Sequence, residues 1–148
     1  MYSSKDFSKT TATIQTQIPA QIPERLIHRG VEESSLDPAF SRERKHPVFI
    51  VDLPSRSVSV TVGHLPERSK TRTHRHAYET ILYILEGRGR TFIEEKIVEW
   101  KAGDAVYVPV WAWHSHENLE ASLCRYLACE NTPLLQNLTG GMALREEL

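Results

Sequence analysis

Short apolar stretches separated by turn residues fill the chain from Pro47 onward, and this pattern limits the possible folds more than any other feature. Valines at positions 58, 60 and 62 alternate with Ser57, Ser59 and Thr61, as in a strand with one buried face. Similar stretches cover residues 48–53, 74–85, 91–94, 96–100, 105–108, 115–118 and 121–130. About seven to nine short strands at regular spacing predict an all-β domain, either a sandwich or a small barrel.

The pattern divides the chain into three parts. Residues 1–46 are polar and charged, so we expect a partly irregular N-terminal arm, with a short helical turn near Asp37-Pro38. Residues 47–131 form the β domain. Residues 132–148 form a C-terminal helix and tail, because Thr132 resembles an N-cap, Pro133 suits the first helical position and glycines follow Leu138.

Composition excludes several classes of function. At 148 residues, with 40% hydrophobic and 25% charged residues, the chain suits one soluble globular domain. The formal net charge of -1 argues against nucleic acid or an anionic membrane surface as a partner. No apolar run is long enough to span a bilayer, and the N-terminus has no secretory signal pattern. Cys124 and Cys129 have an odd spacing, which places them on opposite faces of a strand, so we expect a cytoplasmic protein without a disulfide.

Three histidines are spaced as metal ligands would be. His74 and His76 are two residues apart, so on a strand both imidazoles project from the same face. Strand pairing across a barrel can bring His114 opposite this pair. Three nitrogens on one side of an ion leave its other positions open, as in catalytic metal sites. The alternative is a His-x-His sequence on a surface strand that binds no metal.

The residues around these histidines resemble the two sequence motifs of the cupin superfamily. In the first motif, Gly precedes His-x-His by five residues, and Glu and a second Gly follow. Here His74-Arg75-His76 is followed by Gly87 at the expected distance. The second motif is matched at Gly103, Pro109, His114 and Asn118. The resemblance implies a small antiparallel double-sheet, or jelly-roll, barrel, which agrees with the strand pattern.

Three positions depart from these motifs. Arg68 stands where the first motif has its leading Gly, and Trp111 replaces the Gly of the Pro-x-Gly segment. The carboxylate ligand of the family falls at Thr80, whereas Glu79 is one residue away. Position 79 should point away from the histidines, because side chains alternate along a strand. We therefore expect a three-histidine site, with Glu79 as a fourth ligand only if a β-bulge turns it inward.

Among cupins, the chain is similar to gentisate and salicylate 1,2-dioxygenases in its His74-Arg75-His76 pair, in the missing Glu and in the run from Pro109 to Asn118. This resemblance implies one divalent ion, with Fe(II) favoured and Zn, Mn or Ni as alternatives. His116 follows His114 by two residues, so it is a candidate acid or base that orients a ligand or a substrate hydroxyl. The alternative is a histidine at the rim that bonds to a backbone carbonyl. Those dioxygenases are about twice as long and have two cupin domains, so the resemblance is local.

The leading functional hypothesis is a dioxygenase that acts on a small aromatic or enolisable acid. Arg125 is a candidate for binding its carboxylate, but a position on a solvated strand face is the commoner interpretation. Trp111, Trp113, Tyr83 and Phe92 could line an aromatic pocket, although most such residues belong to a core or a dimer interface. The alternatives are a non-redox metal-dependent isomerase, lyase or hydrolase, and a non-catalytic cupin that binds a small molecule. Exposed sheet edges and the N-terminal arm predict a homodimer, as in other small cupins.

Overall fold

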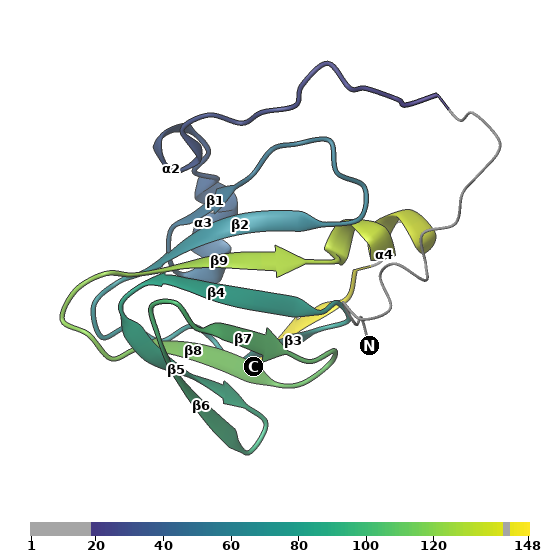
Figure 1. Ribbon diagram of the computed structural model, residues 1–148. Helices are drawn as coiled ribbons and strands as arrows, with labels where there is room; N and C mark the ends of the chain where they lie inside the picture. Colours follow the sequence, from purple (N-terminus) through teal and green to yellow (C-terminus); the bar gives the residue numbers. More distant parts are fainter. Residues whose placement is uncertain (1–18, 141–142) are drawn as a thin grey trace, which may run out of the picture.

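Two five-stranded antiparallel sheets face each other and form a barrel (Figure 1). The computed structural model describes residues 19–140 and 143–148. One sheet has the strand order β1-β2-β9-β4-β7 and the other has the order β10-β3-β8-β5-β6. The strands are β1 (Val48–Ile50), β2 (Ser59–Leu65), β3 (His74–His76), β4 (Thr80–Glu86), β5 (Arg88–Ile93), β6 (Lys96–Lys101), β7 (Ala105–Val108), β8 (His114–Asn118), β9 (Cys124–Glu130) and β10 (Arg145–Glu147).

The predicted all-β double-sheet fold is confirmed, with two differences in the strands. The stretch 74–85 is divided: the chain leaves β3 after His76, and β4 begins in the opposite sheet at Thr80. Strand β10 lies in the segment that we expected to be a tail, where it pairs with β3. A charged three-residue strand such as Arg145–Glu147 carries no hydrophobic alternation, so its sequence has no strand signal.

Within residues 19–140 and 143–148, three short helices accompany the sheets: α2 (Val31–Ser34), α3 (Pro38–Arg44) and α4 (Thr132–Leu138). Helix α3 lies at the predicted Asp37-Pro38 turn, and the Asp37 carboxylate caps it by accepting a hydrogen bond from the Phe40 amide at 2.9 Å. The predicted C-terminal helix is confirmed as α4. Its N-cap is Asn131 rather than Thr132, and the Asn131 side chain instead accepts a hydrogen bond from the Glu79 amide.

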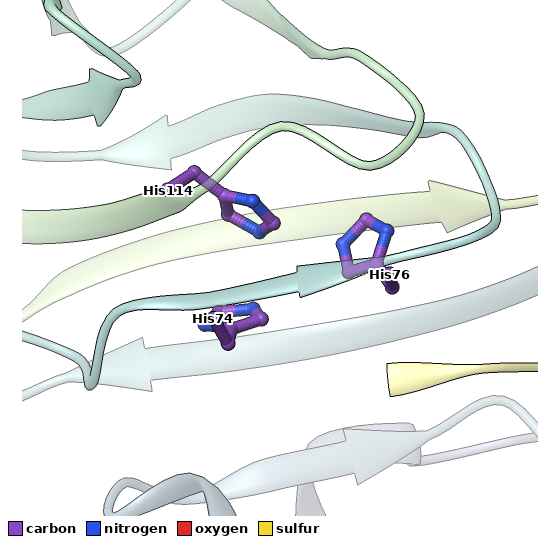
Figure 2. A group of neighbouring side chains, drawn as sticks. All are labelled: His74, His76 and His114. Atoms are coloured by element: carbon purple, nitrogen blue, oxygen red, sulfur yellow. The ribbon is translucent and has the colours of Figure 1, made fainter. Parts of the chain in front are cut away.

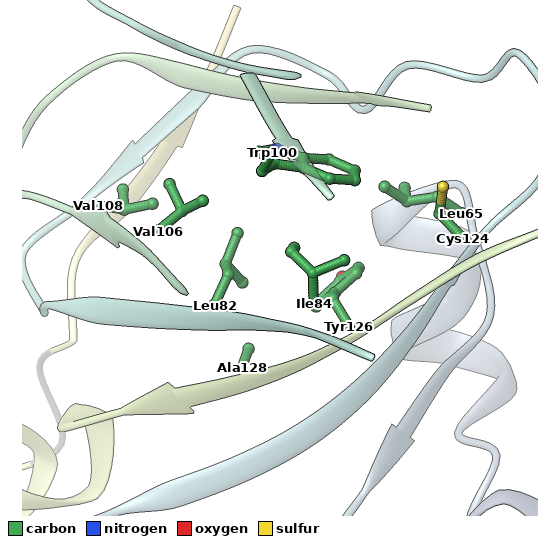
Figure 3. Packing of buried hydrophobic residues seen from close by; sticks show 9 residues of the cluster. All are labelled: Leu65, Leu82, Ile84, Trp100, Val106, Val108, Cys124, Tyr126 and Ala128. Atoms are coloured by element: carbon green, nitrogen blue, oxygen red, sulfur yellow. The ribbon is translucent and has the colours of Figure 1, made fainter. Parts of the chain in front are cut away.

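The hydrophobic core fills one part of the space between the sheets (Figure 3). It follows from the alternation of side chains along each strand, as in β4, where Leu82 and Ile84 are buried and Ile81 and Tyr83 are exposed. Burial of each such side chain contributes about 1.5–3 kcal/mol to stability. The core comprises Leu65, Leu82, Ile84, Trp100, Val106, Val108, Cys124, Tyr126 and Ala128.

Two positions where the cupin motifs have Gly retain the backbone conformation that favours Gly. Arg68 has a φ of 48° and Trp111 has a φ of 63°, both in the left-handed region. The Trp111 amide donates to the carbonyl oxygen of His76 at 2.8 Å, and the Arg68 amide donates to that of Glu120 at 3.0 Å. These bonds hold the two turns in place despite the larger side chains.

The remaining expectations concern the termini and the cysteines. Residues 1–18 of the expected N-terminal arm lie outside the described residues. Cys124 is buried, Cys129 faces the other side of β9 and both are free thiols, as their spacing predicted. In the described part of the chain, no helix has the length and apolar character that crossing a membrane requires.

Candidate metal centre

Three histidines from two paired strands converge inside the barrel (Figure 2). His74 and His76 project from the same face of β3, and His114 is the residue of β8 directly opposite His74. One ring nitrogen of each lies within 4.8 Å of the others. The ring centroids of His74 and His114 are 4.1 Å apart, and those of His76 and His114 are 4.7 Å apart. The structure thus brings together the three residues that the sequence singled out.

Backbone carbonyls determine which nitrogen of each ring carries the proton. His74 Nδ1 lies 2.9 Å from the Arg72 oxygen, His76 Nδ1 lies 2.7 Å from the Tyr78 oxygen, and His114 Nδ1 lies 2.8 Å from the Ala112 oxygen. A carbonyl oxygen only accepts hydrogen bonds, so each Nδ1 must be the donor. Each neutral ring therefore keeps the lone pair on Nε2, as in metal-ligating histidines whose other nitrogen is held by a hydrogen bond.

Burial keeps the three rings uncharged. It is the largest cause that lowers the pKa of His74 to about 2 and that of His76 to about 4, and the neighbouring His114 lowers both further. Burial also lowers the pKa of His114. At neutral pH all three nitrogens are consequently free to bind a cation without first losing a proton.

The two candidate positions for a carboxylate ligand lie on opposite sides of the sheet. Thr80 is buried and lines the same cavity as the histidines, and its hydroxyl donates to Glu130 at 3.3 Å. Glu79 is exposed, and its carboxylate accepts a hydrogen bond from the Tyr107 hydroxyl at 2.7 Å. Glu79 is not part of the group of convergent donors formed by the described residues.

His116 is held beside this group by side chains rather than by a backbone carbonyl. Its Nδ1 lies 3.0 Å from the Thr91 hydroxyl, which also accepts a hydrogen bond from the Trp100 indole at 2.9 Å. The His116 ring centroid is 5.5 Å from that of His114, and the residue lines the cavity. Burial lowers the pKa of His116 well below its ordinary value, so the ring is neutral at pH 7.

The histidines line a cavity of about 50 Å³ between the sheets. Several further polar residues line it that sequence reasoning did not identify: Arg44, His46, Tyr126, Glu130 and Arg145. Arg44 ends α3 and Arg145 begins β10, both outside the segment that carries the motifs. No spacing pattern connects Arg44 and Arg145 to the histidines, because the packing of α3 and the pairing of β10 bring these two residues near.

The structure does not support the binding roles considered for Arg125 and for the two tryptophans near His114. Arg125 lies outside the cavity, where its Nε donates to the Glu32 carboxylate at 3.0 Å. Trp111 and Trp113 do not line the cavity either. The Arg75 guanidinium carbon lies 4.5 Å from the centroid of each indole, so both rings stack on this cation.

The comparison with known proteins identifies a family and one relative that aligns with this chain over most of the relative's length. Residues 61–129 match the family model described as a cupin domain. An uncharacterized protein of Methanocaldococcus jannaschii is 34% identical over 98 residues, which cover 66% of this chain and 76% of that protein.

Several other similar proteins are dioxygenases, and this chain matches only part of each of these enzymes. Gentisate 1,2-dioxygenase 1 of Aquipseudomonas alcaligenes is 36% identical over 61 residues, 41% of this chain and 18% of that enzyme. The crystal structure of a salicylate 1,2-dioxygenase from Pseudaminobacter salicylatoxidans superposes with a TM-score of 0.63 at 16% identity. That superposition covers 69% of this chain and 30% of the enzyme, so the likeness concerns the fold.

Proposed function

The chain belongs to the cupin superfamily, and from that premise we propose that it is a metal-dependent dioxygenase acting on a small enolisable or aromatic acid. His74, His76 and His114 are its proposed metal ligands. The observation that carries this proposal is the set of three Nδ1–carbonyl hydrogen bonds, which leaves three Nε2 lone pairs available within one small cavity. The local sequence likeness to a gentisate 1,2-dioxygenase supports the choice of reaction.

The donor set fits an open divalent site. Three neutral imidazoles suit Fe(II), and also Zn, Mn or Ni, and they contribute no negative charge to the ion. A bound divalent ion supplies a Lewis acid and, when it is Fe(II), an electron donor for oxygen chemistry. A substrate with two oxygen donors, one of them anionic, would balance the charge that the imidazoles leave uncompensated.

The residues of the chain itself orient the substrate and exclude water. Because the charged form of His116 is disfavoured by burial, we assign it a hydrogen bond to a substrate oxygen, with the Thr91 hydroxyl holding the other side of the ring. The cavity of about 50 Å³ is roughly a third of the ~150 Å³ cavity that accommodates benzene in an engineered protein. A compact enolisable acid therefore fits better than an aromatic acid, which would require cavity-lining side chains such as Arg44 to move.

The test combines elemental analysis of protein purified without an affinity tag with an oxygen electrode. Protein reconstituted with Fe(II) is mixed with small 2-oxo acids, gentisate or salicylate. We expect oxygen uptake that requires iron and is lost in His76→Ala but kept in His64→Ala, whose ring lies outside the cavity.

Two results would contradict the dioxygenase proposal. Turnover that persists without oxygen would indicate the non-redox isomerase, lyase or hydrolase. Binding of any divalent ion without turnover of any acid would indicate a cupin that only binds small molecules.

A further inference from the structure

Two arginines bring positive charge to the candidate metal centre from opposite ends of the described chain. Arg145 is the cross-strand partner of His76, so its side chain leaves the sheet on the face that carries the histidines. Arg44 lies at the end of α3. Both side chains line the cavity. Neither residue lies in the segment that matches the cupin family model.

Tyr78 connects Arg44 with the histidines. The Arg44 guanidinium lies beside the Tyr78 hydroxyl, and the Tyr78 ring stacks on His76 with centroids 3.9 Å apart and an interplanar angle of 3°. Both arginines line the same cavity as His74, His76 and His114. Each guanidinium can therefore reach a molecule that is bound at the imidazoles.

The hydrogen bonds of the two guanidinium groups are incomplete. The Nε atoms of Arg44 and Arg145 are both buried, and neither has a hydrogen-bond partner among the described residues. Arg145 forms an ion pair with Glu147, which also accepts a hydrogen bond from Arg72 at 3.1 Å. Glu130 is an acidic neighbour of Arg44 along the cavity wall, and burial raises the pKa of that carboxyl. A buried N–H donor without an acceptor lowers the stability of a protein, so we expect a bound ligand to supply the acceptors for these two donors.

The charges around the cavity indicate the kind of partner. Arg44, Arg72 and Arg145 line it together with Glu130 and Glu147, so the lining has one more cationic than anionic side chain before any cation is bound. Glu43, which pairs with Arg145 at 3.6 Å, is exposed and is not part of this lining. A divalent ion at three neutral imidazoles would increase that surplus of positive charge. A positive surplus in the lining favours an anionic ligand, and the planar guanidinium fork matches a carboxylate.

We propose that Arg44 and Arg145 bind the carboxylate of the substrate, with Arg44 as the principal contact, while the other oxygens of that substrate face the three histidines. This inference rests on the proposed function and names its substrate class as small organic acids that enter as carboxylates. It also assigns α3 and β10 a direct part in binding, because they supply the two cations.

The competing interpretation is that both arginines only attach α3 and β10 to the barrel. A purely structural arginine would affect charged and neutral ligands equally when it is replaced. A carboxylate-binding arginine discriminates between them. The experiment therefore compares acids with their amides, which have nearly the same size and lack the charge.

The measurement is the dissociation constant by titration calorimetry, with protein loaded with redox-inert Zn(II) and two pairs of probes, pyruvate with pyruvamide and salicylate with salicylamide. We expect wild-type protein to bind at least one acid more tightly than its amide. Arg44→Gln should weaken binding of that acid by roughly tenfold to a hundredfold, as expected for the loss of a charged hydrogen bond, and leave the amide unchanged. Arg44→Lys keeps the charge and loses the planar guanidinium fork. Its affinity for the acid should lie between those of wild type and Arg44→Gln. Arg125→Gln is the matched control outside the cavity and should change neither ligand.

Two outcomes would overturn the inference: equal affinity of wild-type protein for acid and amide in both pairs, or unchanged discrimination in both Arg44→Gln and Arg44→Lys. If Arg44→Gln does not fold, the Arg44→Lys comparison decides. The Zn(II) protein carries out no oxygen chemistry in this experiment. If the protein binds acids selectively but its iron form takes up no oxygen, the dioxygenase proposal is refuted and the proposed carboxylate site is still supported.

Discussion

The Tyr107 hydroxyl donates a hydrogen bond to the Glu79 carboxylate at 2.7 Å, on the side of β4 and β7 that faces away from the cavity. This contact occupies the carboxylate nearest in sequence to the proposed ligands and holds it outside the barrel. Thr80, the next residue, is the one that faces the histidines.

Glu79→Gln should therefore leave metal binding nearly unchanged. The amide oxygen still accepts from Tyr107, and no ligand is removed. Any decrease in Zn(II) or Fe(II) affinity, measured by competition with a chelator, should be well below the roughly 10-fold loss seen when a group that supports a ligand is removed. A loss as large as that of His76→Ala would mean that Glu79 turns inward and ligates.

His114→Ala should abolish metal-dependent stabilisation. Wild-type protein at a free Zn(II) concentration 100 times its dissociation constant should gain about 2.7 kcal/mol, because the metal binds only the folded state. The variant should gain almost nothing at that concentration in chemical denaturation. His64→Ala replaces a histidine outside the cavity and should gain as much as wild type. If Zn(II) stabilised all three proteins equally, the metal would bind at a site that does not include His114.

His46 should make the metal-free protein less stable in acid. Its Nδ1 lies 2.8 Å from the Arg44 carbonyl oxygen and its Nε2 lies 2.7 Å from the Tyr126 hydroxyl, so the neutral ring satisfies both partners. Burial lowers its pKa to about 4 in the folded state. The unfolded chain takes up the proton first, at its ordinary pKa of about 6.5.

The contribution of neutral His46 to the free energy of unfolding is thus fully present above pH 6.5 and is lost as the pH falls towards 4. At pH 4.5 the loss for this residue should be roughly 2–3 kcal/mol. Urea denaturation of metal-free His46→Gln should show a smaller decrease between pH 7 and pH 4.5 than wild type shows. A variant with the wild-type pH profile would exclude His46 as a source of acid sensitivity.

Arg68→Gly should make the protein slightly more stable. Arg68 is exposed and has a φ of 48°, which costs a residue other than Gly about 1–2 kcal/mol. Gly relieves this cost, but it also makes the unfolded chain more flexible, which lowers the free energy of unfolding by about 0.5–1 kcal/mol. The free energy of unfolding from urea titration should rise by up to about 1 kcal/mol. Lys70→Gly, at an exposed position with no positive φ, should instead lower it.

The homodimer expected from the sequence stays a prediction, and the outer face of the β4 sheet is where we would test it. Ile81, Tyr83 and Tyr107 are exposed on this face. Exposed apolar patches on soluble proteins commonly mark interfaces. Sedimentation should show a dimer at micromolar concentration, and Ile81→Asp should shift it towards monomer. Ile97→Asp, on the other sheet, is the control. A wild-type protein that sediments only as a monomer would refute the prediction.

The sequence alone was sufficient for the fold class and for the histidines. Side chains on a strand alternate with a period of two, so His74 and His76 had to share a face wherever that strand was placed. The same rule separated Glu79 from Thr80. The motif residues then pointed to His114, and the pairing of β3 with β8 places it opposite His74.

Only the tertiary structure decided what surrounds these histidines. Arg44 and Arg145 reach the cavity because α3 packs at β1 and β10 pairs with β3, contacts between segments far apart in the chain. Conversely, Arg125 and the two tryptophans near His114 face partners outside it. Local periodicity determines which face of a strand a residue occupies. Which distant segment closes that face depends on long-range pairing, for which short polar elements such as β10 carry no hydrophobic pattern.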